Sequence, residues 1–268
     1  MRRITFVVAV SALCTGSLVL GQEPSREMTC DEGWQSNDQV THCEINETAL
    51  PAAQRLSVDG GVNGGMSVKG WSKDQILVRA KVQAAAESSS RAQALARQIV
   101  IRAGGGRIVA DGPPHGDRRE SWSVSYEIFV PHKIDLSLKA HNGGIHIADV
   151  HGTIDFDALN GGVTLQRLAG NVRGHTTNGG LHVELAGNRW EDGQLDATTT
   201  NGGVSLEVPD SYSAHLETGT VNGHINIDFP VTVSGEIDRR LSINLGSGGP
   251  LVRAITTNGG VSIRRKSS

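Results

Sequence analysis

The fold is decided by a ten-residue stretch that occurs three times, as TTNGGLHVEL at residues 176–185, TTNGGVSLEV at 199–208 and TTNGGVSIRR at 256–265. In each copy an Asn-Gly-Gly triplet is followed by apolar residues at alternate positions, such as Leu181 and Val183. Alternation with a period of two predicts a β-strand with one buried face. Asn-Gly favours a tight turn because both residues tolerate positive φ. Each stretch therefore predicts a turn that leads into a strand.

The same triplet recurs along most of the chain. The asparagines lie 18 residues apart from 142 to 160 and from 160 to 178, then 23 to position 201, 21 to a degenerate triplet at Asn222, and 36, or twice 18, to position 258. Self-similarity at a fixed period is typical of repeat architectures. The predicted turn residues are Asn63, Gly64, Gly65, Asn142, Gly143, Gly144, Asn160, Gly161, Gly162, Asn178, Gly179, Gly180, Asn201, Gly202, Gly203, Asn258, Gly259 and Gly260.

Two architectures fit this repeat, an antiparallel meander and a solenoid in which each unit is one coil. A second short strand, marked for example by Ile154 and Phe156, follows half a repeat later. The near-constant spacing favours the solenoid, because identical positions then stack about 4.8 Å apart. In such a stack Asn can hydrogen-bond to Asn and Thr to Thr. The sequence predicts an all-β, single-stranded β-solenoid, β-helix-like, built from repeats of about 18 residues.

The first half of the chain follows the pattern less regularly. Residues 76–82 and 122–130 alternate as strands, and 107–110 form a shorter one. Residues 88–97 break the pattern, because serines suited to an N-cap precede apolar residues at helical spacing. We expect one short inserted helix here, covering a side or an edge of a sheet.

Composition and charge exclude several classes. The chain has 34 glycines without a three-residue period and 8 prolines among 268 residues, so it is neither collagenous nor disordered. The formal net charge is −3 and no basic stripe runs along the sequence. Since nucleic-acid binders normally carry such a stripe, we expect no nucleic-acid partner.

The N-terminus resembles a secretory leader. Arg2 and Arg3 precede an apolar run that ends in small residues, which predicts a signal peptide over 1–21 and no transmembrane segment in the mature chain; a retained anchor is the alternative. Two cysteines then remain, Cys30 and Cys43, and an even pair in an exported chain predicts one disulfide, with two free thiols as the alternative. The expected organisation is a disulfide-tied segment over 22–54 and a solenoid domain over 55–266.

No constellation predicts catalysis, a cofactor or a metal. The triplets lack the lysine of a phosphate loop, and their Asn, Gly and Thr residues do not match a calcium-binding β-roll. His146 and His182 occupy equivalent positions two repeats apart, too far to share an ion. Asp155 and Asp157 share an outer face, but no long loop builds a cleft around them. The four tryptophans, Trp34, Trp71, Trp122 and Trp190, are scattered, which favours packing over a sugar-stacking platform.

These residues resemble the bacterial DUF4097 family, β-strand-repeat proteins often labelled adhesins by analogy. The matching stretches are the Cys30–Cys43 head, NGGMSVKGW at 63–71, ILVRAKVQA at 76–84, SWSVSYEIFVP at 121–131 and the serial NGG turns. The resemblance covers residues 28–266 and implies an extracytoplasmic β-solenoid, with a link to envelope stress for some relatives. It brings no catalytic residues, and fold alone does not give function.

The function expected from the sequence is that of a non-enzymatic exported scaffold or adhesin-like binding protein, periplasmic or at the cell surface. A solenoid offers a long repetitive face for an extended partner, here an unidentified protein or polymer of the cell envelope. The alternatives are a polysaccharide-active β-helix enzyme and a signalling module in envelope stress.

Overall fold

The computed structural model describes residues 28–30, 39–114, 119–229 and 239–266. These residues form two ten-stranded sheets and one short helix, so the chain is all-β as predicted. The predicted leader over 1–21 and Trp34 lie outside the described residues.

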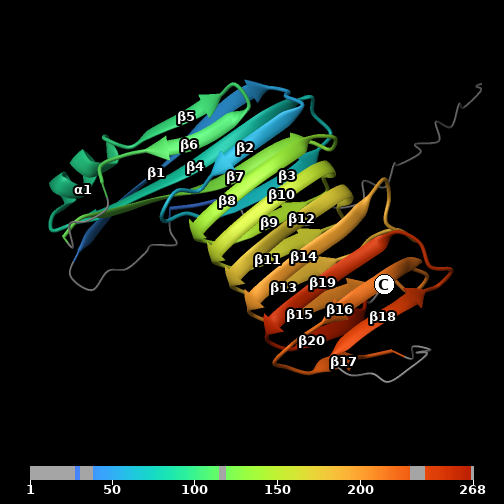
Figure 1. Cartoon of the computed structure of the whole chain (residues 1–268). Coiled ribbons are helices and arrows are strands. Elements are labelled where there is room, and N and C mark those ends of the chain that lie inside the picture. The colour runs from blue at the N-terminus through green and yellow to red at the C-terminus, as the bar shows by residue number, and fades with distance from the viewer. Residues whose placement is uncertain (1–27, 31–38, 115–118, 230–238, 267–268) are drawn as a thin grey trace, which may run out of the picture.

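The two sheets face each other and are called sheet A and sheet B (Figure 1). In spatial order, the strands of sheet A are β1 (Val40–Pro51), β4 (Gln75–Ala86), β7 (Ser121–Pro131), β3 (Met66–Trp71), β9 (Ile145–Ala148), β11 (Val163–Gln166), β13 (Leu181–Glu184), β15 (Val204–Val208), β20 (Val261–Arg265) and β17 (Ile225–Ile227). Those of sheet B are β5 (Val100–Gly104), β6 (Arg107–Asp111), β2 (Arg55–Asp59), β8 (Asp135–Asn142), β10 (His151–Asn160), β12 (Ala169–Asn178), β14 (Gln194–Asn201), β19 (Leu251–Asn258), β16 (Ala214–Gly219) and β18 (Arg240–Leu245).

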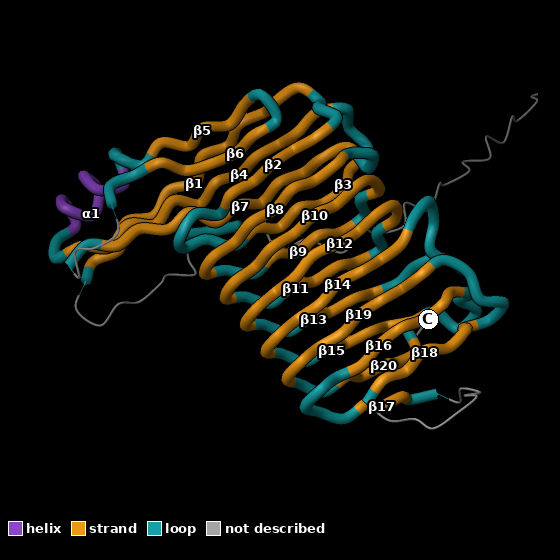
Figure 2. The backbone as a smooth tube through the Cα atoms, in the orientation of Figure 1, coloured by secondary structure: helices purple, strands orange, loops and turns teal. Residues whose placement is uncertain are grey.

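The centre of the molecule is a stack of rungs, each made of one strand of sheet B, an NGG turn and one strand of sheet A (Figure 2). Equivalent residues of successive rungs pair in parallel, so that Phe156 lies between Leu138 and Gly174. Parallel pairing of neighbours excludes the antiparallel meander for this part of the chain. We call the NGG edge of the stack the turn side, and the opposite edge, where sheet A returns to sheet B, the return corner.

The core lies between the two sheets. Along each strand the alternate apolar residues are buried, as Ile145 and Ile147 are in β9, while the residues between them face outward. Full burial of one aliphatic side chain contributes roughly 1.5–3 kcal/mol. A core only two side chains thick has room for Val, Leu, Ile and Ala, which accounts for the low aromatic content.

Rung order differs from chain order at both ends of the stack. The rung β2–β3 is followed in the chain by the outer strands β4 to β7, and the chain then returns to stack β8–β9 on β2–β3. At the other end, β19–β20 lies between β14–β15 and β16–β17, although it comes last in sequence. The 36-residue interval between Asn222 and Asn258 is therefore not two successive coils, as the spacing suggested, because it contains β18 and a return to an inner position.

The outer part of the N-terminal half is antiparallel and carries the helix. The strands β1, β4 and β7 pair antiparallel. The expected helix is α1 (Ser89–Ala96), whose first turn is capped by Ser88 through a bond from the Arg91 backbone N–H at 3.3 Å. It buries Ala92, Leu95 and Ala96 and packs against β4 and β1, at one end of these long strands (Figure 1).

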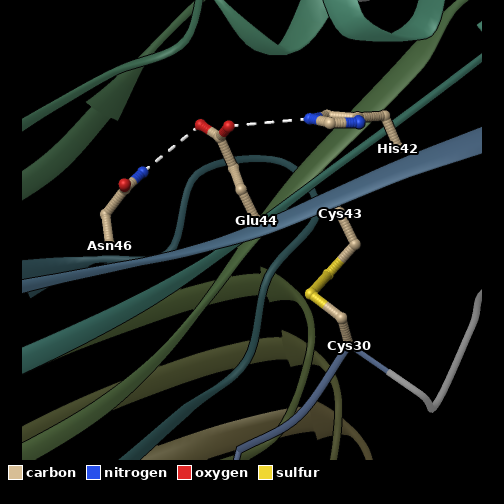
Figure 3. Close-up of a disulfide and its surroundings, with 5 residues drawn as sticks. All are labelled: Cys30, His42, Cys43, Glu44 and Asn46. Carbon is tan, nitrogen blue, oxygen red and sulfur yellow. Dashed lines mark hydrogen bonds and ion pairs between the residues drawn. A yellow bond between two sulfur atoms is a disulfide. The ribbon is translucent and has the colours of Figure 1, made fainter.

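The cysteine pair forms a disulfide. Cys43 lies on β1 and its Sγ is bonded to that of Cys30, which fastens residues 28–30 to the edge of sheet A (Figure 3). On the same strand, Glu44 accepts a hydrogen bond from Asn46 at 3.4 Å and pairs with His42 at 3.6 Å.

Candidate binding face

The predicted turn residues meet along the turn side. Each asparagine ends a sheet B strand or its equivalent, and all but Asn63 donate through Nδ2 to the Oδ1 of the asparagine on the neighbouring rung. In spatial order the ladder is Asn63, Asn142, Asn160, Asn178, Asn201, Asn258 and Asn222, joined by six hydrogen bonds of 2.7–3.0 Å. Asn222 of the degenerate triplet completes the ladder at its end.

The first glycine of each triplet is required for close approach, and among these glycines only Gly259 also has a positive φ, of 159°, as the sequence suggested. Gly179 has no left-handed φ. A Cβ at this position would instead collide with the carbonyl oxygen of Gly161 on the neighbouring rung, and one at Gly161 with that of Gly143. The rungs pack so closely here that only a residue without a side chain fits.

Threonines brace the same turns, but they do not bond to one another as expected. Thr176, Thr199 and Thr256 are buried, and each donates through Oγ1 to a glycine carbonyl of the neighbouring rung at 2.7 Å. The acceptors are Gly161, Gly179 and Gly202. The Thr side chains point inward, so the acceptor within reach of each hydroxyl is a glycine carbonyl of the neighbouring turn and not another threonine hydroxyl.

The second glycine of the triplet faces outward, and on successive rungs these glycines form the bottom of a shallow trough on sheet A. A Cβ at Gly180 would lie 3.5 Å from the Gly203 carbonyl oxygen, an ordinary contact, so close packing does not demand glycine here. The trough has a volume of about 600 Å³, and most of its exposed lining is apolar. Its lining consists of the glycine row, the apolar residues that follow it and the polar side chains of the next outward position: Gly162, Gly180, Gly203, Gly260, Val163, Leu181, Val204, Val261, Thr164, His182, Ser205, Ser262 and Asn226. His224, which replaces the second glycine of the degenerate triplet, stands at its end.

A larger groove opens at the return corner of the same face, and we call it the corner groove. It has a volume of about 910 Å³, and its lining comes from β3, β7, β9, β11 and β13 and the turns that follow them. The polar row of the trough continues into it, because Thr164 pairs with His146 and His146 with Ser67. The trough and the corner groove together are called the binding face.

An ion-pair cluster forms one side of the corner groove. Arg167 donates to both carboxylate oxygens of Asp149, through Nε at 2.7 Å and an Nη at 2.8 Å, and also to Glu184 at 3.3 Å. Glu184 accepts from Gln166 at 2.9 Å and pairs with Lys266. Asp149 and Arg167 have φ of 60° and 51°, so both corners are left-handed.

This cluster fixes the charges of its members. The hydrogen bonds from Arg167 hold the pKa of Asp149 below its usual value, and the bond to Asp149 raises the pKa of Arg167. Burial alone acts to raise the pKa of Glu184, but the hydrogen bonds and charges of Lys266 and Arg167 outweigh it, so this pKa also lies below its ordinary value. Burial, together with the Arg167 charge, lowers the pKa of His146. At neutral pH the groove therefore holds ionised carboxylates and a neutral imidazole.

Aromatic and basic side chains form the other side. Trp71 and Phe129 lie with ring centroids 5.4 Å apart, and the Trp71 Nε1 donates to the Gln75 carbonyl at 2.9 Å. The Lys73 ammonium lies 4.7 Å from the Trp71 ring centroid. Lys69 lies between Phe129 and Ala148 in the register of sheet A. Of the four tryptophans, Trp122 and Trp190 are packed in the core as expected, whereas Trp71 is only half-buried and lines the groove.

The candidate carboxylates of sheet B belong to a row of alternating charges. Asp155 and Asp157 point outward from β10, and Asp155 accepts from Arg173 at 3.2 Å. On the next rungs Arg253 donates to Asp196 at 2.7 Å. A second, smaller hollow of about 390 Å³ lies over this row. Asp155 therefore forms an ion pair with Arg173 and does not form a pair of carboxyl groups with Asp157.

The candidate metal ligands are not brought together. Thr164 lies between His146 and His182 in the register, as the repeat predicted. Among the residues with described positions, no three His, Cys, Asp or Glu side chains gather closely enough to hold a metal ion.

The sequence missed most of the corner groove. Lys69, Lys73, Asp149 and Arg167 carry no motif, and they meet only because strands far apart in sequence stack in register. Two features of the sequence could have indicated this groove. Trp71 ends an alternating strand, and Asp149 and Arg167, which have opposite charges, occupy the same position in successive repeats.

Comparisons with known proteins give a family and a set of structural neighbours. The family model described as Toastrack DUF4097 matches residues 114–264, more than half of the chain. No curated protein matches the chain. Within the described residues, no helix has both the length and the apolar character needed to cross a membrane.

Several solved structures are similar at low identity. A "putative cell adhesion protein" from Clostridium sporogenes is 15% identical, with 85% of this chain and 100% of that chain covered and a TM-score of 0.45. A "putative adhesin" from Bacteroides fragilis is 12% identical, with coverages of 83% and 97% and a TM-score of 0.37. A "putative lipid binding protein" from Parabacteroides distasonis is 10% identical, with coverages of 84% and 97% and a TM-score of 0.36.

Proposed function

The chain belongs to the Toastrack DUF4097 family, and from this premise we propose that it is an exported, non-enzymatic binding protein that holds an extended partner of the cell envelope along the binding face of sheet A. The observation that carries the proposal is the continuity of this face. Its polar row runs from Ser67 through His146 and Thr164 to Asn226, one residue per rung, and joins the trough to the corner groove.

Export is supported by the disulfide. Structural disulfides persist in oxidising compartments and are rare in the cytosol, and the Cys30–Cys43 bond fastens the first described residues. The proposal includes a signal peptide over 1–21, a disulfide-tied segment over 22–54 and a domain over 55–266, located in the periplasm or at the cell surface. It also takes the stack to be a β-solenoid whose unit is the NGG repeat of about 18 residues.

A binding role without catalysis is supported by the state of the carboxylates. A hydrolase that uses two carboxyl groups needs one protonated and one ionised near the same bond. In the corner groove, however, Asp149 and Glu184 are each bonded to a cation, and both pKa values lie below their ordinary values. Both groups are therefore ionised at neutral pH, which suits positioning of a ligand better than proton transfer.

The test is cross-linking in intact cells of the source organism after fractionation has located the protein. We expect an envelope partner to be captured by the wild type and lost in Lys69→Glu/Lys73→Glu, which inverts two charges of the corner groove. Lys139→Glu makes the same kind of change on the outer face of sheet B and is the matched control. Equal capture by all three proteins would place the partner elsewhere and contradict the proposal, as would turnover of a polysaccharide by the purified protein.

A further inference from the structure

We infer that the partner of the binding face is an acidic polysaccharide, a linear carboxylated glycan that lies along the stack axis with its acid groups at Lys69 and Lys73. This inference rests on the proposed function and names the chemical class of the ligand.

The first step concerns charge. Every carboxylate that lines the corner groove is already bonded to a cation: Glu127 to Arg79 at 3.1 Å, Asp149 to Arg167, and Glu184 to Arg167 and Lys266. Lys69 and Lys73 line the same groove, and among the described residues neither has an ion pair. The groove thus offers two ammonium groups without an ion pair, that of Lys73 lying against the Trp71 ring, on a chain whose net charge is negative. The complementary ligand carries negative charge.

The second step concerns the aromatic rings. Trp71 and Phe129 form one wall beside these lysines. An aromatic ring packs well against the C–H face of a pyranose ring. The half-buried Trp71 ring is held by its bond to the Gln75 carbonyl, with the Lys73 ammonium 4.7 Å from its centroid and the Arg79 guanidinium 5.7 Å from that of Phe129. A sugar would therefore contact the part of the Trp71 ring that Lys73 leaves exposed. A wall of this kind beside ammonium groups without an ion pair suits a sugar that carries an acid.

The third step distinguishes a glycan from a peptide. A peptide that adds to a sheet needs a free strand edge, but β9, β11, β13 and β15 each have neighbours on both sides. Protein interfaces also centre on large aromatic or arginine anchors. The trough has none, and in the corner groove Arg167 is already bonded to Asp149 and Glu184. The outward row of the trough instead presents Thr164, His182, Ser205 and Asn226, groups that both donate and accept, whereas the Oγ of Ser262 in this row is buried. Such a row on most rungs matches a ligand with a hydroxyl group on every unit.

The fourth step gives the direction. The trough runs across β11, β13, β15 and β20, so a polymer in it crosses successive rungs and follows the stack axis. At the far end the outward position that is glycine on the inner rungs is occupied by His224. A bulky side chain at this position limits how far a polymer can extend.

The test uses oligogalacturonate and its fully methyl-esterified form, which share a backbone and differ in whether each acid group is an ionised carboxylate or a neutral methyl ester. Titration calorimetry should give at least tenfold tighter binding of the carboxylated oligomer, with an affinity that falls as salt is added. Lys69→Gln/Lys73→Gln should weaken this binding about tenfold, since two partly exposed ion pairs are lost. Lys139→Gln on sheet B should leave it within about twofold. Melting temperatures near that of the wild type confirm that the variants are folded.

A length series tests the direction. Affinity should rise with oligomer length and then level off, and His224→Gly, which restores the triplet, should move the plateau to longer oligomers. An unmoved plateau in folded His224→Gly would refute the placement along the axis.

Other outcomes separate the ligand class from the proposed function. Equal binding of the acid and the ester, with no effect of the lysine substitutions, overturns the acidic ligand. If neither oligomer binds while Lys69→Glu/Lys73→Glu still loses its envelope cross-link, the polysaccharide is wrong and the binding face stands. If that cross-link also persists, both proposals fall.

Discussion

Asp149 and Arg167 show how single residues shape the binding face. Left-handed φ costs an L-residue on the order of 1 kcal/mol, and asparagine or aspartate tolerates it better than most. The two-pronged contact between Arg167 and Asp149 offsets this cost and fixes the return corner. Gly70 allows the corner to form, because a Cβ there would collide with the Asp149 carbonyl oxygen.

Replacing Asp149 tests the charge of this contact. Asp149→Asn keeps the shape and tolerates the backbone but removes the charge, and we expect a loss of about 1–2 kcal/mol at pH 7. Because the hydrogen bonds from Arg167 depress the pKa of Asp149 in the folded state below its ordinary value, the stabilisation is present above the unfolded pKa and is lost as pH falls through the folded pKa. The difference in unfolding free energy between wild type and variant should therefore shrink between pH 5 and roughly pH 2. A difference that stays constant over this range would argue against an ionised Asp149 as the cause.

Neighbouring glycines test close approach against backbone conformation. Gly179→Ala forces a Cβ into the Gly161 carbonyl and should cost about 1–3 kcal/mol. Gly180→Ala is the matched control, since its Cβ makes only an ordinary contact at 3.5 Å. Chemical denaturation of both variants decides the matter. Equal losses would mean that packing between rungs is not what excludes a side chain at position 179.

At the scale of elements, the asparagine ladder joins the rungs on the turn side. An inner member such as Asn160 takes part in two side-chain hydrogen bonds, with Asn142 and Asn178, whereas Asn222 at the end takes part in one. Asn160→Ala should cost about 1–2 kcal/mol and Asn222→Ala about half as much. Denaturant melts give both values. A larger loss of unfolding free energy at Asn222 would show that the stabilisation does not follow the number of ladder hydrogen bonds that each asparagine makes.

The elements themselves could be predicted from the sequence to a large extent. The alternation at Ile145 and Ile147 predicted strands, and the serines at positions 88–90 predicted the helix, because both signals are local. The order of the rungs could not be predicted, since every NGG unit presents the same edge and register to its neighbours. Nothing local tells Asn201 to pair with Asn258 and not with Asn222.

The binding face was harder to predict than the fold for the same reason. Lys69 and Arg167 lie 98 positions apart in the sequence and meet only through stacking. The sequence suggested positive φ as the reason for the NGG glycines. Turn statistics describe the conformation of a local segment, and they do not include the close approach of a neighbouring rung. Packing between rungs is a tertiary constraint. It determines both why position 179 must be glycine and which group Thr176 bonds to.

At the scale of the molecule, a stack transmits disturbance poorly. Each rung contacts only its neighbours, so stability is close to a sum of local terms. The disulfide tests this property, because it closes a loop with a sequence separation of 13 at the outermost strand of sheet A. Cys30→Ser/Cys43→Ser should lower the local opening free energy of β1 by up to about 3 kcal/mol.

Hydrogen exchange measures how far that loss spreads. Amides of β1 should exchange faster in the variant, and those of β10, β12 and β14 should be unchanged. A uniform loss of protection across both sheets would show a single cooperative unit and contradict the independence of the rungs.

The displaced order of the last rungs has a consequence for how the chain is made. A ribosome delivers residues 214–227 well before residues 251–265, yet the later segment must occupy the inner slot. Until residues 251–265 have been made, the only exposed edges on which β16 and β17 can stack are those of β14 and β15. In the folded protein these edges are paired with β19 and β20. The rungs from β8 to β15 follow chain order and can stack as they emerge, but the last rungs cannot reach their final order until residues 251–265 have been made.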